Sequence, residues 1–247
     1  MGERAIETRW VVVVMPAYNA ERTLKQTYDE LPHDLVDRVI LVDDASGDGT
    51  VDLARRLNLT LVVHDRNKGY GANQKTCYAE ALKEGATIIV MVHPDYQYDP
   101  KLLPDMIGPK EAGRADVVLG SRMMGVPVYK LGMPWWKYLG NKLLTGIENN
   151  VFDMNLSEYH TGYRAYSREV LEHVEFERNS DDFVFDQEII VQIVERAYRI
   201  AEVPVPVRYF SEASSVGLGG SVLYGTKIIA LLCRFLWQGR RAGNQVE

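Results

Sequence analysis

The chain has 247 residues, of which 46% are apolar and 25% charged, with 28 basic residues against 34 acidic ones. This length suits one domain with a large core, and the composition excludes disordered, collagen-like and low-complexity proteins. The net charge of −6 argues against a general nucleic-acid binder, and two cysteines are too few for a disulfide framework. A polar start and the short apolar run Trp10–Met15 predict no signal peptide, so we expect a cytoplasmic protein.

Short runs of β-branched and aliphatic residues alternate with helical patterns through the first half of the chain. The runs are continuous, which is typical of strands buried on both faces of a parallel sheet. The predicted strands are Trp10–Met15, Arg38–Val42, Leu59–Val63, Thr87–Val92 and Ala115–Leu119. The helices predicted between them are Ala20–Leu31, Gly49–Leu57, Gly71–Glu84 and Pro100–Ala112. This alternation predicts an α/β fold with a doubly wound, mostly parallel sheet flanked by helices.

The regular alternation stops after Gly120. Two prolines within Arg199–Val207 predict an edge strand, since proline cannot serve a central ladder. Further helices are predicted over Trp135–Asn150, Arg168–Val174, Asp182–Tyr198 and Ser221–Arg240. We therefore expect one domain over residues 1–215 and a C-terminal amphipathic helical tail over residues 216–247.

Polar residues follow four of the predicted strands, where an open parallel sheet binds its ligands. Any one of these clusters can be a structural turn, and Asp44 with Ser46 can form a simple Asx turn. Together, at one edge of one sheet, they predict a site. The clusters are Pro16-Ala17-Tyr18-Asn19 with Glu21, Asp43-Asp44-Ala45-Ser46, His93-Pro94-Asp95-Tyr96-Gln97, and Gly120-Ser121-Arg122.

Phosphate and cation chemistry both fit these clusters. The segment Arg66–Gly71 opens a helix with glycines, and helix N-termini favour phosphate, although neither a dinucleotide-binding nor a P-loop motif is present. Asp95 and Gln97 stand two residues apart, so their oxygens can reach one hard cation that bridges a diphosphate. Guanidinium groups suit phosphate oxygens, and the candidates are Arg122, Arg164 and Arg208.

Several of these motifs resemble the family 2 inverting glycosyltransferases, which have the GT-A fold. The similar segments are Val11–Asn19, Val42–Ser46 with Gly49-Thr50, and Asn67–Gly71. The Gly120-Ser121-Arg122 and Thr161–Tyr166 segments are similar to the dolichyl-phosphate mannose synthase branch, and the similarity runs from about Trp10 to Phe210.

The resemblance implies a hexosyltransferase that uses a nucleoside diphosphate sugar, UDP- or GDP-linked. It places Pro16, Tyr18 and Glu21 beside the base and ribose, and Asp44 on the base or sugar hydroxyls. The residues expected to bind the donor are Pro16, Ala17, Tyr18, Asn19, Glu21, Asp43, Asp44, Lys68, Gly69, Asn73 and Arg208.

The resemblance also implies a divalent cation held by Asp95 and Gln97. Relatives have an aspartate where this chain has His93, and a neutral imidazole suits Mn²⁺ better than Mg²⁺. We therefore expect Mn²⁺ or Mg²⁺, with Mn²⁺ favoured, and His93 is either a ligand or a neighbour of the ligands.

The implied reaction is displacement at the anomeric carbon with inversion. A polyprenyl or dolichyl phosphate acceptor needs no base, and Arg122 and Arg164 would hold its phosphate. A glycan or glycolipid hydroxyl needs a carboxylate base, for which Glu158, Asp181 and Asp182 are candidates. We favour the lipid phosphate and count Asp95, Arg122, Arg164, Glu158 and Asp182 as catalytic candidates. A catalytically weak sugar-nucleotide-binding subunit remains the alternative.

The apolar C-terminal tail indicates a membrane surface as a further partner. Charged residues interrupt Ser221–Arg240, so we expect this helix to lie on the cytoplasmic face of a membrane and not to cross it. We expect a role in cell-envelope glycan biosynthesis. The alternatives are a helix packed on its own domain and a homodimer surface that includes Trp135-Trp136.

Overall fold

A computed structural model describes residues 8–125, 132–206 and 218–243. Its centre is a seven-stranded sheet with the strand order β3-β2-β1-β4-β6-β5-β7. All neighbouring strands pair in parallel except β6, which is antiparallel to both β4 and β5. The strands are β1 Val11–Ala17, β2 Arg38–Asp43, β3 Thr60–Val63, β4 Ile88–Met91, β5 Val117–Ser121, β6 Arg164–Ser167 and β7 Ile200–Pro204.

Helices cover both faces of this sheet, as the continuous apolar strands predict. Successive residues of β1 point to opposite faces, so Val12 and Val14 belong to one core and Val11 and Val13 to the other. The helices are α1 Glu21–Asp29, α2 Thr50–Arg56, α3 Tyr70–Lys83, α4 Leu103–Glu111, α5 Trp135–Phe152, α6 Arg168–His173, α7 Phe185–Glu195 and α8 Leu218–Gly243. Short 3₁₀ helices occupy Pro100–Leu102 and Phe176–Arg178.

The core that contains Val11 and Val13 packs against α1, α2 and α4, and the core that contains Val12 and Val14 packs against α3, α6, α7 and α8. Leu24, Ala54 and Met106 represent the former group, whereas Tyr78, Leu171 and Ile189 represent the latter. The predicted doubly wound sheet is confirmed, and β7 stands at the sheet edge as its prolines indicate.

Two predicted elements differ from the structure. The segment Arg164–Ser167 forms β6, although it was not among the predicted strands. The helix predicted from Asp182 begins only at Phe185, because the Asp182 carboxylate accepts a hydrogen bond from the Val184 N–H at 2.9 Å and shapes the turn before the helix.

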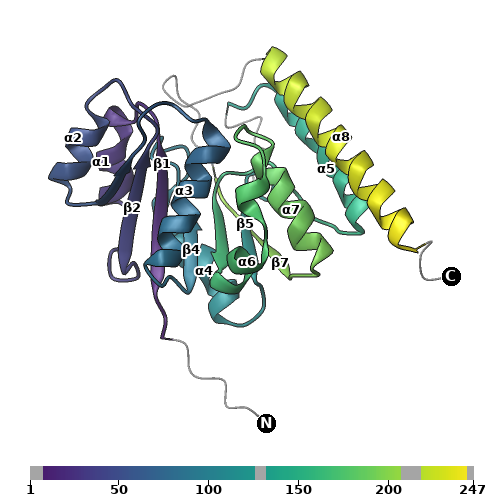
Figure 1. Ribbon diagram of the computed structural model, residues 1–247, viewed down its shortest axis with the longest axis horizontal. Coiled ribbons are helices and arrows are strands. Elements are labelled where there is room, and N and C mark those ends of the chain that lie inside the picture. Colours follow the sequence, from purple (N-terminus) through teal and green to yellow (C-terminus); the bar gives the residue numbers. More distant parts are fainter. Residues whose placement is uncertain (1–7, 126–131, 207–217, 244–247) are drawn as a thin grey trace, which may run out of the picture.

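The helices α5 and α8 lie side by side along one flank of the molecule (Figure 1). The rings of Phe152 and Phe235 meet with their centroids 5.3 Å apart. Ile228 and Leu232 bury α8 against the domain, whereas other apolar side chains of both helices face solvent. The exposed apolar residues of the pair are Trp135, Leu139, Leu143, Val222, Leu223, Ile229, Leu236 and Trp237.

Candidate active site

The loops after β1, β2 and β4 lie at the carboxyl edge of the sheet. Each contains a residue in the left-handed region, namely Asn19, Ala45 and Tyr96, with φ of 53°, 61° and 58°. Residues other than glycine rarely adopt this conformation, and such strained positions cluster at functional sites. Because β6 is antiparallel, its first residue, Arg164, joins this edge opposite Met91.

The loops after β1 and β2 are hydrogen bonded to each other. The Asn19 N–H donates to Ser46 Oγ at 2.8 Å, and the Gly49 N–H donates to Glu21 Oε2 at 3.0 Å. Asn19 and Glu21 therefore fix the shape of this edge. Tyr18, which precedes Asn19, is 56% exposed, so its ring faces solvent and is available to a ligand. Pro16 and Ala17 lie within β1, where they are buried.

Asp43 and Asp44 end β2 as buried carboxylates that organise the loops around them. Asp43 Oδ1 accepts from the Ser46 N–H at 2.9 Å. Asp44 accepts from the backbone N–H groups of Lys68 and Gly69 at 2.8 and 3.0 Å. These bonds connect β2 to the start of α3, as a buried carboxylate requires.

The start of α3 packs tightly against the segment before α7. Gly69 has φ of 102°, and a Cβ at this position would lie 2.6 Å from the Asp181 carbonyl oxygen. That carbonyl accepts from the Gly71 N–H at 2.8 Å. Asn73 donates to the Ala17 carbonyl at 3.3 Å, while its own Oδ1 has no hydrogen-bond partner among the described residues.

His93 lies inside the site, between an aromatic ring and a glycine. Its ring stacks on Tyr70 with centroids 5.7 Å apart, and a Cβ on Gly162 would meet the imidazole at 2.8 Å. The Tyr70 hydroxyl donates to Asp186 Oδ2 at 2.8 Å. Burial lowers the pKa of His93 although the nearby Asp95 and Asp186 raise it, so the imidazole is neutral at pH 7.

Arg164 is 1% exposed and is held by backbone carbonyls. Its Nε donates to the Thr161 carbonyl at 2.7 Å and its Nη2 to the Tyr159 carbonyl at 2.9 Å. Nη1 donates to the Asp186 carbonyl at 3.1 Å and lies 3.8 Å from the Asp186 carboxylate. These contacts hold the loop before β6 from within, which argues against the direct phosphate contact expected of Arg164.

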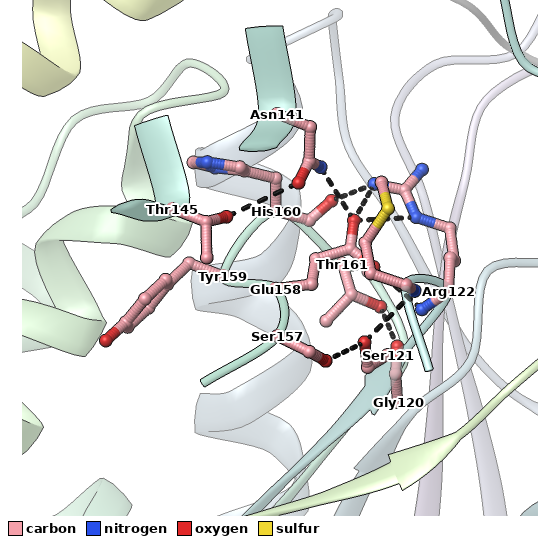
Figure 2. Close-up of polar contacts among 12 residues, drawn as sticks. Gly120, Ser121, Arg122, Asn141, Thr145, Ser157, Glu158, Tyr159, His160 and Thr161 are labelled. Carbon is pink, nitrogen blue, oxygen red and sulfur yellow. Dashed lines mark hydrogen bonds and ion pairs between the residues drawn. The ribbon is translucent and has the colours of Figure 1, made fainter. Parts of the chain in front are cut away.

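Arg122 and Glu158 form a buried ion pair (Figure 2). Glu158 accepts from Arg122 Nη2, from Nε at 2.8 Å and from the Arg122 backbone N–H at 2.7 Å. Asn141 of α5 donates to the same carboxylate at 2.9 Å, and Arg122 Nη2 also donates to the His160 carbonyl at 2.6 Å. One loop, residues 157–163, therefore contacts both Arg122 and Arg164.

Charge around this ion pair shifts two pKa values. Burial alone would raise the pKa of Glu158, but the charge and hydrogen bonds of Arg122 outweigh it and hold the pKa below its ordinary value. Partial burial and the nearby positive charge of Arg122 lower the pKa of Lys137, in the first turn of α5. The charge of Arg122 therefore acts on Lys137 at this end of the site.

Asp182 lies at the start of the segment that leads into α7, next to α8. Its carboxylate forms an ion pair with Lys227 of α8 and accepts from the Val184 N–H. Burial raises its pKa, but these contacts overcome that effect and the pKa is below its ordinary value. Arg208, predicted to bind the donor, lies outside the described residues.

The family model described as "Glycosyl transferase family 2" matches residues 12–175. The chain belongs to this family. The match spans β1 to α6 and therefore includes the loops after β1, β2, β4 and β5 that make up the candidate site. The predicted family and the predicted class of enzyme, a glycosyltransferase, are confirmed.

Relatives of this glycosyltransferase cover nearly the whole chain. A UDP-N-acetylglucosamine–dolichyl-phosphate N-acetylglucosaminyltransferase from Methanococcus voltae is 26% identical over 235 residues, 88% of this chain and 92% of that protein. A polyprenol monophosphomannose synthase from Mycolicibacterium smegmatis is 27% identical over 229 residues, 90% of this chain and 83% of that protein. The predicted likeness to lipid-phosphate glycosyltransferases is therefore confirmed.

A solved structure confirms the predicted GT-A fold. Glucosyl-3-phosphoglycerate synthase from Mycobacterium tuberculosis, in complex with Mn²⁺, uridine diphosphate and phosphoglyceric acid, superposes on this glycosyltransferase with a TM-score of 0.70. The sequences are 21% identical, and the superposition covers 92% of this chain and 79% of the other.

Four side chains of this glycosyltransferase were absent from the predicted site. His64 contacts Asp44 at 2.7 Å, and Tyr70 and Asp186 join the His93 cluster. Lys137 lies near Arg122. His64 directly follows β3 and Tyr70 belongs to the Asn67–Gly71 segment, whereas Asp186 and Lys137 lie in helices and reach the site through tertiary packing.

Proposed function

We propose that this glycosyltransferase moves a hexosyl group from a nucleoside diphosphate sugar to a polyprenyl or dolichyl phosphate, with inversion at the anomeric carbon. The observation that carries the proposal is that relatives named for lipid-phosphate acceptors align over about nine-tenths of this chain. The donor base and sugar are left open between UDP- and GDP-linked hexoses.

The donor binds along the loops after β1 and β2 and at the start of α3 in this proposal. Tyr18 supplies an exposed ring for the base, and Asp43 and Asp44 keep the surrounding loops in place. Asn73 Oδ1 is buried and has no hydrogen-bond partner among the described residues, so it can accept a hydrogen bond from a hydroxyl or N–H of the nucleotide sugar. Lys68 and Gly69 lie beside it, where backbone can approach a phosphate closely.

The loop after β4 fits a divalent cation. Asp95 Oδ1 accepts from the Gln97 N–H at 3.1 Å, while the described residues give Oδ2 no hydrogen bond. Among these residues no three His, Cys, Asp or Glu side chains converge, which suits Mn²⁺ or Mg²⁺ sites completed by substrate phosphates and water. Asp95 and Gln97 would hold the ion, with the neutral His93 beside it. An ion held there would supply positive charge to offset the negative charge of the departing diphosphate.

The acceptor phosphate binds at Arg122 and Lys137. Burial and, as the smaller cause, the positive charge of Arg122 lower the pKa of Lys137, and an anion bound at both cations would relieve their repulsion. Arg164 supports the loop behind them. Glu158 and Asp182 both have lowered pKa values, which makes them weak bases and favours a phosphate over a sugar hydroxyl as nucleophile.

The exposed apolar face of α5 and α8 lies on the cytoplasmic leaflet of a membrane. Gly219–Gln238 is long and apolar enough to cross a bilayer by length and composition alone, with a mean hydropathy of 1.3. Its contacts with the domain, including the Lys227–Asp182 ion pair, favour a helix lying on the surface.

Charge favours a lipid surface over a second copy of the chain. The helix α8 carries four basic residues and no acidic one, although the whole chain has a net charge of −6. Basic residues beside an apolar face are attracted to anionic lipids. A homodimer through the same face would appear as a concentration-dependent mass in solution without lipid.

A transfer assay tests the proposal. Radiolabelled UDP- and GDP-hexoses are incubated with the full chain, Mn²⁺ or Mg²⁺, and vesicles that contain polyprenyl phosphate. Label from one donor is expected in the organic phase, and Asp95→Asn should abolish it. The control Asp99→Asn keeps the oxygen that receives the Lys101 N–H and should remain active. Label that stays in water with every donor contradicts the proposal.

A further inference from the structure

A buried polar cluster, to be called the α8 latch, lies where α5, α7 and α8 meet. It consists of Glu148, His160, Gln187 and Tyr224. His160 Nδ1 is 3.2 Å from the Tyr224 hydroxyl and 3.0 Å from Gln187 Nε2, which also donates to the Tyr224 hydroxyl at 3.2 Å. On its other side, His160 Nε2 lies 3.1 Å from Glu148 Oε2. None of these four side chains has a role in the chemistry described above.

The Tyr224 hydroxyl keeps its proton, because burial raises its pKa, and it can therefore donate to His160 Nδ1 at 3.2 Å. Glu148 is 1% exposed, and its carboxyl group lies beside His160 Nε2, although neither of its oxygens has a hydrogen-bond partner among the described residues. Packing alone could join these helices at less cost than burying a carboxylate, so the polar groups select one arrangement of the helices and the loop.

His160 connects the latch to the acceptor end of the site. Its ring points away from Arg122 toward the helices, whereas its carbonyl faces Arg122 and accepts from Nη2 at 2.6 Å (Figure 2). The residues on either side, Tyr159 and Thr161, give their carbonyls to Arg164. A shift of the His160 ring therefore moves the backbone that places Arg122.

We propose that His160 and Tyr224 are positioning residues, through which α8 sets the place of Arg122 for the acceptor phosphate. This inference rests on the proposed function for the identity of the acceptor. Because α8 also presents the exposed apolar face, the same helix that meets the lipid fixes the cation that receives the lipid phosphate. The donor loops after β1 and β2 have no described hydrogen bond to the latch.

The test compares Tyr224→Phe with a matched control. The hydroxyl of Tyr198 also contacts a histidine, at 2.8 Å from His173 Nδ1. Tyr198 lies just before the first residue of β7, at the sheet edge opposite the candidate site. Tyr224→Phe should raise KM for polyprenyl phosphate about fivefold, the equivalent of one lost hydrogen bond, with kcat and nucleotide affinity unchanged. Tyr198→Phe should leave all three unchanged. His160→Asn, which keeps an acceptor near Nδ1, should retain a lower KM than His160→Leu.

Hydrogen exchange separates this inference from the proposed function. In the full chain without donor or acceptor, amides of residues 157–163 should exchange faster in Tyr224→Phe than in the wild type or Tyr198→Phe. Equal exchange overturns the inference, whatever the chain transfers. Faster exchange with an unchanged acceptor KM overturns the link to the acceptor site. A wild type that transfers nothing to lipid phosphate contradicts the proposed function, and exchange alone then decides whether the latch positions the loop.

Discussion

Replacing Arg122 with methionine leaves a buried carboxylate without its counter-charge. Glu158 has a fully buried side chain, and the Arg122 side chain is 14% exposed. The variant loses the bonds from Nε and Nη2 but keeps the backbone N–H of residue 122 at 2.7 Å and Asn141 at 2.9 Å. Breaking a buried pair costs about 3–5 kcal/mol, and because two donors remain we expect about 3 kcal/mol. This loss lowers Tm by about 6–12 °C in a domain of this size.

The loss should depend on pH, because the pKa of Glu158 lies below its ordinary value in the native protein. A lowered pKa contributes stability above the unfolded value of about 4.3, and that contribution disappears as pH falls through the folded pKa. In Arg122→Met, burial without the guanidinium raises the pKa of Glu158, so protonation becomes stabilising. The free-energy gap between the two proteins should therefore narrow as pH falls from 7 toward 4.

Urea denaturation across this pH range measures the gap. The double variant Arg122→Met/Glu158→Gln should recover most of the stability, because the neutral amide still accepts from the backbone N–H and leaves no unpaired charge. A loss below about 1 kcal/mol that does not change with pH would refute the reasoning, since it would match an exposed ion pair.

Three further outcomes follow from the same structure. Gly69→Ala should lower the free energy of unfolding by about 1–3 kcal/mol and weaken nucleotide binding in a thermal-shift assay, since the new Cβ meets a backbone carbonyl at 2.6 Å. In the control Gly85→Ala the new Cβ meets nothing within 4 Å, so the loss of stability should be smaller and nucleotide binding should stay intact. Lys137→Met should raise KM for the lipid phosphate about tenfold without changing KM for the sugar donor. An equal rise in the lipid-phosphate KM of Lys142→Met, on the exposed side of α5, would contradict this prediction. Leu236→Glu should reduce vesicle sedimentation at least about tenfold, and a similar loss in Val63→Glu, on β3, would show that the apolar face is not responsible.

The sheet was largely predictable because its strands carry local signals. Val11–Val14 and Ile40–Val42 are continuous apolar runs, and such runs belong to strands covered on both faces. Arg164–Ser167 has no such run, and its place between β4 and β5 depends on long-range pairing. The family resemblance identified its motif without revealing that it is a strand.

The candidate site was predictable where residues lie in the loops after strands, as Asp44 and Asp95 do. The role of Arg164 was harder to predict, since the sequence does not reveal that its guanidinium turns inward to backbone carbonyls. Lys137 and Tyr224 lie in helices far from the strand-end motifs, and only the packing of α5 and α8 brings them to the loop around His160.

The most direct test of the central claim is a paired acceptor experiment. Vesicles with polyprenyl phosphate and vesicles with the matched polyprenol, which lacks the phosphate, are incubated with the wild type and the donor that stabilises it against heat. Mass spectrometry should find a hexosyl group on the phosphate of the first lipid and none on the second, because the proposed function places an anion at Arg122 and Lys137 and because Glu158 and Asp182, with lowered pKa values, are weak bases. Transfer to both lipids, or to the polyprenol alone, would contradict the account.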